Sequence, residues 1–485
     1  MSFSWQAANE EFLRACREKR ARLLRETEKF YPVTPTGKVY YLSSQNGNDE
    51  KSGTSPDEAW RSCGKLKDAL QTGDTVLFEC GSLFRESVPT VSGVTYASYG
   101  TGAKPRFYGS IDAAKKEDWE PIGAHLYRYS KEIDQYNDIG NLVFNGGEAW
   151  GIKIQKCTDG EFSLALENVS TGKDFYKKVE SYPFQNGMDL SDRYDLSYFH
   201  GEDNRLYLIC RAGNPGEVFR QVELGQSVKI FMASNVENIT ICNLHFSNIG
   251  CFAIRTAGCK NLTVRNCKFE FIGGAIQFGY IAPWRNYRTR YGNGIENWGA
   301  CDGMTVEHCS FSQIYDAAVT TQSNGEKDDM TRLTYNGNVF EKCEYGYELW
   351  SGSWDCLFGP VSVRGNICTG IGEGLSSQRP DKGPESFFNS KGGYRMQDCV
   401  VEENLIWGSV GSLMRCNQIH NASYDRGYLF DRNIYIHEIG KTMGLLSEDY
   451  PIHSSKLRAY PYDEETVAKI CAAGFEEHGQ FYYYF

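Results

Sequence analysis

The segments "NITICNLHFSNIG" (residues 238–250) and "NLTVRNCKFEFIG" (261–273) decide how this chain folds, because both alternate apolar and polar residues and then turn. The theme returns in "GMTVEHCSFSQIY" (303–315), "RLTYNGNVFEKCE" (332–344), "VSVRGNICTGIGE" (361–373), "CVVEENLIWGSVG" (399–411) and "YLFDRNIYIHEIG" (428–440). Period-two alternation predicts β-strands, and a repeat of this length predicts a solenoid or a propeller.

Two positions of the repeat can be aligned across all seven segments. The first holds Leu244, Cys267, Cys309, Asn338, Asn366, Asn404 and Asn433. The second, two residues later, holds Phe246, Phe269, Phe311, Phe340, Cys368, Ile406 and Tyr435. We expect the asparagines to adopt a left-handed backbone at a turn and to hydrogen-bond along a stack, with cysteine filling the same inward position as a small apolar group.

The spacing of the repeats separates the possible β architectures. The interval grows from 23 residues between Leu244 and Cys267 to 42 between Cys267 and Cys309, as in a solenoid with loops of variable length on one side. An antiparallel sandwich or a propeller is the alternative, but propeller blades keep a more constant period. The sequence therefore predicts an all-β chain built on a right-handed parallel β-helix.

Net charge, hydropathy and cysteine content exclude several classes of function. The 485 residues carry a net charge of −11 without a basic run, which argues against nucleic-acid binding, and no apolar run is long enough to span a membrane. Residues 1–30 resemble an amphipathic helix rather than an export signal, so we expect a cytoplasmic protein whose 17 cysteines are free thiols. Neither a CxxC nor an HxxxH pair occurs, so no metal site is expected.

We divide the chain into five parts. Residues 1–37 form an N-terminal amphipathic helix, and 38–110 form an N-terminal cap with the first coils. Residues 111–225 break the rhythm of the repeat and are interpreted as an inserted, sandwich-like antiparallel β subdomain. Residues 226–440 form the main β-helix, and 441–485 a C-terminal cap that includes the helix-like run "DEETVAKICAAGF" (463–475).

The region before the insertion carries a family resemblance. "KVYYLSSQNGNDEKSGTSPDEAWRSCGKLKDAL" (38–70), "GDTVLFECGSLFRES" (73–87) and "SGVTYASYGTGAKPRFYGS" (92–110) resemble the opening of the pectin-lyase-like β-helix superfamily, especially its β-xylosidase and α-L-fucosidase/xylanase members. The resemblance implies a helical cap, which Ser55 to Glu58 would begin, and a carbohydrate-active enzyme. The superfamily also holds lyases, epimerases and adhesins.

A candidate site follows from the strands "FAIRTAGC" (252–259), "NGIENWGAC" (293–301), "AAVTTQS" (317–323), "GYELWSG" (346–352) and "GLSSQRPD" (374–381). If Ile254, Ile295, Val319, Tyr347 and Leu375 point inward, one outward row is formed by Arg255, Glu296, Thr320, Glu348 and Ser376. Asp316 stands beside this row in "IYDAAVTTQ" (314–322), where the preceding repeat has Gly274. Three carboxylates would then share one surface.

Two carboxyl groups are what glycoside hydrolysis requires, one as acid and one as nucleophile or base. We assign Asp316 as nucleophile or base and Glu348 as acid/base, with the two roles exchangeable, and Glu296 as a residue that binds hydroxyls or modulates the pair. The spacing leaves retention and inversion open. For each acid taken alone, an ordinary solvated position is the alternative.

Substrate contacts are expected around the row. Trp298, Trp350 and Tyr315 offer aromatic faces, Gln322 and Gln378 occupy equivalent places in "TTQS" and "SSQR", and Arg379 and Arg255 offer charged donors. The loop 280–294 brings Arg285, Arg288 and Arg290 beside the row, either to recognise an acidic sugar or to offset the local acidity.

These observations predict a hydrolase of carbohydrate metabolism that cleaves plant- or host-derived oligosaccharides, exo-acting, with no cofactor and no nucleic-acid or membrane partner. A polysaccharide lyase or uronate epimerase, which could use Ca²⁺, is the alternative on the same fold. A non-catalytic carbohydrate-binding β-helix is the second alternative. The sequence does not indicate an oligomeric state.

Overall fold

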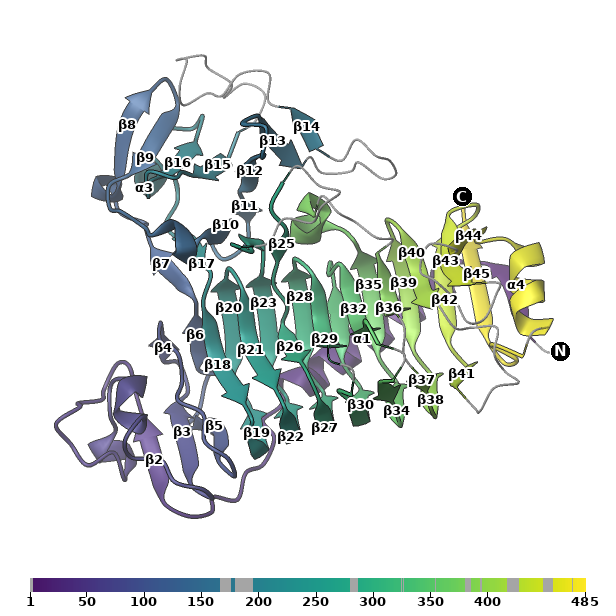
Figure 1. Ribbon diagram of the computed structural model, residues 1–485, viewed down its shortest axis with the longest axis horizontal. Coiled ribbons are helices and arrows are strands. Elements are labelled where there is room, and N and C mark those ends of the chain that lie inside the picture. Colours follow the sequence, from purple (N-terminus) through teal and green to yellow (C-terminus); the bar gives the residue numbers. More distant parts are fainter. Residues whose placement is uncertain are drawn as a thin grey trace.

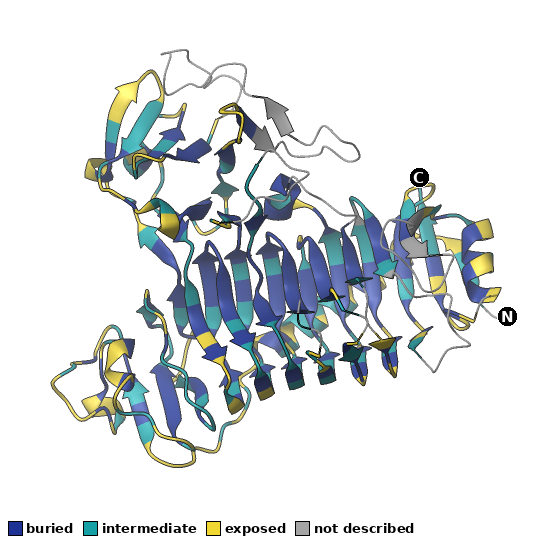
Figure 2. Ribbon diagram, in the orientation of Figure 1, coloured by how far each residue is buried: buried dark blue, intermediate teal, exposed yellow. Residues whose placement is uncertain are grey.

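The computed structural model describes residues 3–165, 176–178, 195–279, 287–323, 325, 327–353, 355–379, 385–392, 395–416, 427–447, 457–472 and 474–485. Three long sheets of mainly parallel strands wind around one apolar core, and the predicted β-helix fold is confirmed (Figure 1). Its central strands are buried along most of their length (Figure 2).

Each complete coil passes through the three sheets in the same order, first sheet B, then sheet A, then sheet C. Sheet B contains β2 (Val39–Leu42), β3 (Thr75–Glu79), β5 (Thr95–Tyr99), β19 (Glu237–Cys242), β22 (Cys259–Arg265), β27 (Cys301–Glu307), β30 (Met330–Asn336), β34 (Val361–Arg364), β38 (Cys399–Glu402) and β41 (Tyr428–Asp431), with β33 (Leu357–Phe358) and β37 (Arg395–Met396) beside them. Sheet A contains β4 (Leu83–Phe84), β6 (Arg106–Tyr108), β20 (His245–Ile249), β23 (Lys268–Ile272), β28 (Ser310–Ile314), β31 (Val339–Glu341), β35 (Ile367–Ile371), β39 (Leu405–Ser409), β42 (Ile434–Glu438), β45 (Gln480–Tyr484) and β1 (Ser4–Ala7). Sheet C contains β18 (Lys229–Ser234), β21 (Phe252–Ala257), β26 (Ile295–Trp298), β29 (Ala317–Ser323), β32 (Tyr345–Ser351), β36 (Ser386–Gly392), β40 (Ser412–Cys416), β43 (Thr442–Ser447) and β44 (Leu457–Pro461).

The second aligned position of the repeat forms an inward stack in sheet A. The strand register pairs, in succession, Phe246, Phe269, Phe311, Phe340, Cys368, Ile406 and Tyr435. The rings of Phe269 and Phe311 stack with centroids 4.5 Å apart. The predicted alignment is therefore confirmed, and the stacked rings fill the core of the solenoid.

The first aligned position forms a ladder of buried side chains where sheet B turns into sheet A. The Oδ1 atom of each ladder asparagine accepts the backbone N–H of the ladder residue one coil earlier, at 2.8 Å for Asn338 and Asn366 and 2.9 Å for Asn404 and Asn433. Each Nδ2 also donates to a backbone carbonyl, Val363 for Asn404. The predicted hydrogen-bonded stack is confirmed, because the side chains pair backbone groups that the turn leaves without a strand partner.

The backbone conformation expected for the ladder was wrong by one residue. The left-handed residue is the one before the ladder position, for example Gly337, Gly365 and Glu403, each with a φ between 61° and 64°. Asparagine is required here for its side-chain amide rather than for its backbone.

Glu476 ends the ladder. Asn433 donates its backbone N–H and its Nδ2 to the Glu476 carboxylate at 3.2 and 2.6 Å, and the Tyr435 hydroxyl donates at 2.6 Å. Burial raises the pKa of Glu476 to about 7 despite these donors. Helix α4 (Glu464–Ala472) precedes this residue and buries Val467, Ile470 and Cys471 against the same core. The C-terminal segment thus covers the last coil.

The N-terminal helix α1 (Glu10–Glu28) lies along the outer face of sheet A, behind the β-helix in Figure 1. Strand β1 pairs with β45 at the C-terminal end of that sheet. Cys16 forms an apolar cluster with Ile367, Leu405 and Ile436 on that face. The residues expected to begin a capping helix at Ser55 form only the 3₁₀ turns η1 (Pro56–Glu58) and η2 (Cys63–Leu66).

The inserted segment leaves the solenoid at the corner between sheets A and C, after β6, and returns before β18. It forms a four-stranded sheet of β7 (Ser110–Asp112), β17 (Val222–Gln226), β10 (Ile139–Phe144) and β11 (Ala149–Trp150). A second sheet contains β8 (Trp119–Gly123), β9 (Leu126–Tyr129), β16 (Leu206–Ile209), β15 (Ser197–His200), β12 (Ile152–Lys156), β13 (Phe162–Ala165) and β14 (Tyr176–Lys178). Its short helical turns are η3 (Lys116–Asp118), η4 (Gln135–Asn137) and α3 (Pro215–Val218). A separate apolar core, including Trp119, Leu142 and Tyr198, holds this unit together.

Two later coils also extend at the corner between sheets A and C. Between β23 and β26 the chain forms the hairpin of β24 (Ala275–Ile276) and β25 (Arg290–Tyr291), and between β35 and β36 it forms η5 (Gly374–Gln378). The hairpin begins where Gly273 and Gly292 meet so closely that an added Cβ on Gly292 would lie 2.3 Å from the Gly273 backbone. No helix in the described part of the chain is long and apolar enough to cross a membrane.

The ladder predicts the result of removing one rung. Asn404→Ala would leave the backbone N–H of Asn366 and the carbonyl of Val363 buried without their partner, which should lower the free energy of unfolding by about 2–4 kcal/mol. Denaturant unfolding followed by circular dichroism measures the change. The exposed Asn137→Ala is the control and should stay within about 0.5 kcal/mol of wild type. Equal stability of both variants would contradict a structural role for the ladder.

Candidate active site

Sheet C carries a row of polar side chains in strand register. Arg255 pairs with Glu296, Glu296 with Thr320, Thr320 with Glu348, and Glu348 with Asn389. The side chains of Glu296 and Glu348 are therefore two strands apart, about 9.6 Å between backbones. The register agrees with the expected row as far as Glu348.

Beyond Glu348 the expected row is wrong, because the chain leaves the coil after β35 to form η5 and only returns to sheet C in β36. Leu375 and Ser376 lie in η5, and β36 supplies Phe388 and Asn389 at the two positions expected for them, with Lys391 at the position expected for Gln378. Gln378 is consequently not equivalent to Gln322. Its Oε1 accepts from the backbone N–H of Lys153 at 3.1 Å and its Nε2 donates to the carbonyl of Gly151 at 3.0 Å, so this buried side chain ties η5 to the inserted subdomain.

Glu348 is buried under four donors. Its Oε2 accepts from Thr320 at 3.0 Å and Gln322 at 2.5 Å, and its Oε1 accepts from Asn389 at 3.1 Å and lies 2.8 Å from the Lys391 ammonium. Burial opposes its ionisation, but Lys391, then Arg379 and Thr320, bring the pKa below its ordinary value. Glu348 thus stays ionised, the opposite of what its assignment as the general acid requires.

Glu296 has the contrasting environment. It is 6% exposed, accepts from the Nδ2 of Asn293 at 2.9 Å and lies 3.4 Å from the Arg255 guanidinium. Burial is the main reason that its pKa rises to about 7, with repulsion from Asp316 and, to a lesser extent, Glu348 adding to the rise. Arg255 and Asn293 oppose the change. A carboxylic acid with this pKa holds a proton near neutral pH and can donate it.

Asp316 lies in the short turn between β28 and β29, at the corner where the longer coils carry their insertions. Its carboxylate forms an ion pair with Arg379, the residue after η5. Asn293 links it to Glu296, because Asn293 accepts the backbone N–H of the neighbouring Ala317 at 2.8 Å while donating to Glu296. Asp316 and Glu296 are thus brought together by adjacent coils.

The aromatic candidates separate into two groups. Trp298 and Trp350 are partly exposed and stack with centroids 6.2 Å apart, on the outward row that also contains Gln322. Tyr315 is fully buried, with the Arg290 guanidinium 4.5 Å above its ring. Sugar contact is therefore available to the two tryptophans but not to Tyr315.

The arginines of the loop 280–294 have different surroundings. Arg290 is fully buried and donates to the carbonyl of Gly274 at 2.8 Å, so it fixes the hairpin rather than facing the row. Arg288 is partly exposed and lines a pocket against the inserted subdomain. Arg285 lies outside the described residues.

Sequence reasoning missed Asn293, Asn389 and Lys391. The two phenylalanines in "SFFNSKG" (386–392) favour the strand that holds the last two, but the preceding "GLSSQRPD" (374–381) resembles a strand too. Across the described residues, no three His, Cys, Asp or Glu side chains are grouped as a metal site would require.

Comparison with known proteins finds similarity to carbohydrate-active enzymes. No protein-family model matches the chain. It is similar to the lacto-N-biosidase of Bifidobacterium longum subsp. longum, with 32% identity over 356 residues, which are 66% of this chain and 22% of that protein. The chain therefore spans about a fifth of the length of this curated relative.

Three solved structures resemble the fold at low identity. They are a glycoside hydrolase (13% identity, 84% of this chain and 89% of that chain, TM-score 0.47), XylC in complex with xylose (11%, 87% and 73%, 0.41) and the GH136 lacto-N-biosidase from Eubacterium ramulus (12%, 98% and 69%, 0.38). The fold assignment rests on the strand pairing of this chain itself.

The ion pair between Arg255 and Glu296 predicts how the pKa of Glu296 responds when Arg255 is replaced. Arg255→Gln removes a cation that lowers the pKa of Glu296, so that pKa should rise by about 0.5–1 unit above its value of about 7. A titration of the Glu296 carboxyl by ¹³C NMR measures the change directly. Arg265→Gln, which removes the partner of Glu307 on sheet B, is the control and should leave it unchanged. An unchanged or lower pKa in Arg255→Gln would contradict the proposed electrostatics.

Proposed function

We propose that this chain is a glycoside hydrolase that cleaves oligosaccharides with a pair of carboxyl groups, Glu296 and Asp316. The observation that carries the proposal is the contrast between Glu296 and its two acidic neighbours. Glu296 has a pKa of about 7, whereas Asp316 and Glu348 each form an ion pair with a cation, Arg379 and Lys391 respectively. Environments that separate the pKa values of neighbouring carboxyl groups are the pattern expected for a glycosidase acid and its partner. The identity of 32% to a lacto-N-biosidase supports the same class.

Glu296 is proposed as the general acid. Below about pH 7 its carboxyl retains a proton that it can donate to the glycosidic oxygen as the bond to the leaving group breaks. Asn293 orients the carboxyl group by donating to Oε2. The assignment differs from the one made from the sequence, in which Glu348 and Asp316 shared the two roles in either order and Glu296 modulated them.

Asp316 is proposed as the nucleophile or base. It lies on the coil adjacent to Glu296 and affects the pKa of Glu296 more strongly than Glu348 does. Its ion pair with Arg379 favours the ionised form that attack on the anomeric carbon, or activation of water, requires.

Glu348 is proposed as a positioning residue. A carboxylate has about four acceptor sites, and Thr320, Gln322, Asn389 and Lys391 contact Glu348. Attack on a sugar would require these contacts to be broken. Holding Gln322 between Trp298 and Trp350 is the simpler role, and these three side chains are proposed to bind the sugar next to the cleaved bond, with Arg255 beside the acid.

The proposed substrate is an oligosaccharide that ends in a lacto-N-biose unit, released by exo action. The name of the curated relative supports the unit, and the insertions around the corner between sheets A and C support a closed end to the site. A screen of aryl glycosides, including the aryl β-lacto-N-bioside, tests this choice. Release of an unsaturated product absorbing in the ultraviolet would instead indicate a lyase.

The two carboxyl roles predict opposite dependence on the leaving group. Glu296→Gln should lower kcat/KM by about 10²–10⁴ on an oligosaccharide, whose leaving group needs a proton, and by less than about tenfold on a nitrophenyl glycoside, whose leaving group does not. Asp316→Asn should lower kcat by about 10²–10⁴ on both. Steady-state kinetics on matched substrates measures the difference.

The control for these variants is Glu307→Gln, an outward glutamate on β27 that pairs with Arg265 and should keep wild-type kinetics. Equal losses on both substrates for Glu296→Gln would remove it as the acid. Full activity of Asp316→Asn would show that another group is the nucleophile or base.

A further inference from the structure

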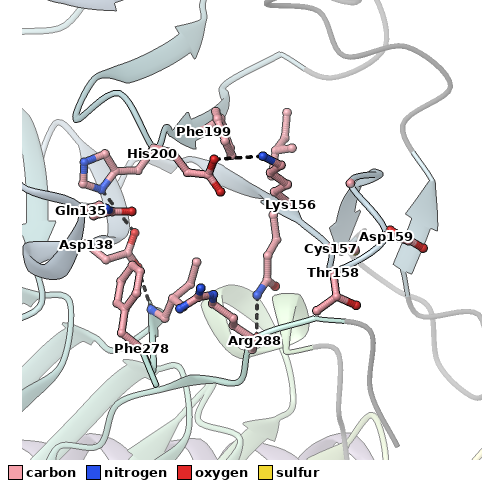
Figure 3. A pocket seen from close by; sticks show the side chains of 15 residues that line it. Gln135, Asp138, Lys156, Cys157, Thr158, Asp159, Phe199, His200, Phe278 and Arg288 are labelled. Carbon is pink, nitrogen blue, oxygen red and sulfur yellow. Dashed lines mark hydrogen bonds and ion pairs between the residues drawn. The ribbon is translucent and has the colours of Figure 1, made fainter. Parts of the chain in front are cut away.

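A cavity lies between the inserted subdomain and the hairpin of β24 and β25. It has a volume of about 510 Å³ and is lined by β12 and β15 of the subdomain, by η4, and by the hairpin residues Phe278 and Arg288. None of the lining residues belongs to the row on sheet C or is Asp316. In Figure 3 the side chains of Gln135, Phe278, Arg288 and Lys156 surround the opening. The volume falls within the range of about 300–1,000 Å³ that is usual for small-molecule sites.

An aromatic platform stands at the rim of this cavity. Tyr136 is 67% exposed, and its ring centroid lies 5.1 Å from that of Phe278. The Arg288 guanidinium lies 4.9 Å from the same Phe278 ring. A large aromatic side chain held exposed beside a cavity offers an apolar face that the C–H face of a sugar ring can cover.

The walls of the cavity combine donors and acceptors of both charges. Lys156 and Arg288 supply cationic donors, whereas Asp159 and Glu202 supply anionic acceptors. Lys156 and Glu202 already form an ion pair at 3.0 Å. Because neither sign dominates, the walls favour a neutral ligand whose groups donate and accept, as hydroxyls do.

The floor of the cavity is rigid. Lys153 donates to both oxygens of Asp138 at 2.6 and 2.5 Å, and Asp138 also accepts the backbone N–H of Ile276 from the hairpin at 2.6 Å. His200 lies 3.4 Å from the same carboxylate. The subdomain and the hairpin are thus joined beneath the cavity, so a ligand would meet a preformed site.

We propose that this cavity is a second carbohydrate-binding site, which takes a neutral oligosaccharide against the platform of Tyr136 and Phe278, with Arg288 and Gln135 binding its hydroxyls. The site does not require the carboxylates of sheet C to be catalytic. Only the choice of lacto-N-biose as one probe rests on the proposed function.

Binding is tested with lacto-N-biose, cellobiose and xylobiose as neutral probes and a digalacturonate as the acidic comparison. Isothermal titration uses full-length Asp316→Asn, so that a probe is not consumed, and a crystal soaked with the tightest probe locates it. We expect at least one neutral probe to bind in the cavity with a Kd below about 10 mM and the digalacturonate to bind more weakly. Adding Tyr136→Ala should weaken cavity binding by about tenfold.

The controls separate this site from the proposed catalytic one. Phe485→Ala removes an aromatic side chain that is 93% exposed elsewhere and should leave binding unchanged. In the otherwise wild-type chain, Tyr136→Ala should leave kcat on a short aryl glycoside unchanged. The proposal would be overturned if no neutral probe were found in the cavity. It would also be overturned if the digalacturonate bound more tightly than the neutral probes, or if Tyr136→Ala did not weaken binding. Hydrolysis without cavity binding would overturn this inference alone, and cavity binding without hydrolysis would overturn only the proposed function.

Discussion

The buried amide ladder at the corner between sheets B and A is the constraint on which the rest of the structure depends. Each ladder asparagine fixes the height of one coil relative to the next, because its Oδ1 can accept the backbone N–H of Asn338, Asn366 or Asn404 at one register only. A slip by one residue would also turn the stacked apolar side chains of sheet A outward. The register of sheet C, and with it the polar row from Arg255 to Asn389, follows from this corner.

The opposite corner, between sheets A and C, is free of the ladder and holds the variable parts of the molecule. The inserted subdomain, the β24–β25 hairpin and η5 all leave the solenoid there, on different coils. Asp316 occupies the same corner on a coil with a short turn. The ladder fixes the corner between sheets B and A, whereas the corner between sheets A and C accepts loops of very different length. These loops can therefore surround the carboxylates while the strands that carry them stay in register.

Much of this arrangement was readable from the sequence because it depends on period and residue type. Alternation identified the inward Phe246 to Tyr435 stack, and the repeated asparagines identified the ladder. The row could be followed only to Glu348, because "GLSSQRPD" (374–381) mimics a strand although residues 374–378 form η5, and the true continuation through Asn389 comes later in the chain. A sequence pattern does not reveal which of two alternating segments stays in the coil.

The chemical roles were harder to predict than the positions, for a physical reason. Glu296 and Glu348 share one residue type, one row and nearly equal burial, yet their pKa values shift in opposite directions. Burial opposes ionisation of both side chains. At Glu348 the cations Lys391 and Arg379 outweigh burial, whereas at Glu296 the single cation Arg255 does not, and repulsion from Asp316 adds to the effect of burial. Lys391 and Arg379 reach the site from residues beyond the point where the pattern could be followed.

The inserted subdomain contacts the candidate site through η5. Gln378, the last residue of η5, bonds to the backbone of Lys153 and Gly151 in the subdomain, and the next residue, Arg379, pairs with Asp316. Lys153 in turn holds Asp138, which receives the backbone of the hairpin at Ile276. A displacement of the subdomain would therefore move Arg379, the cation that pairs with Asp316. The geometry of the carboxylates and the floor of the cavity beside the β24–β25 hairpin thus depend on the same hydrogen bonds and ion pairs.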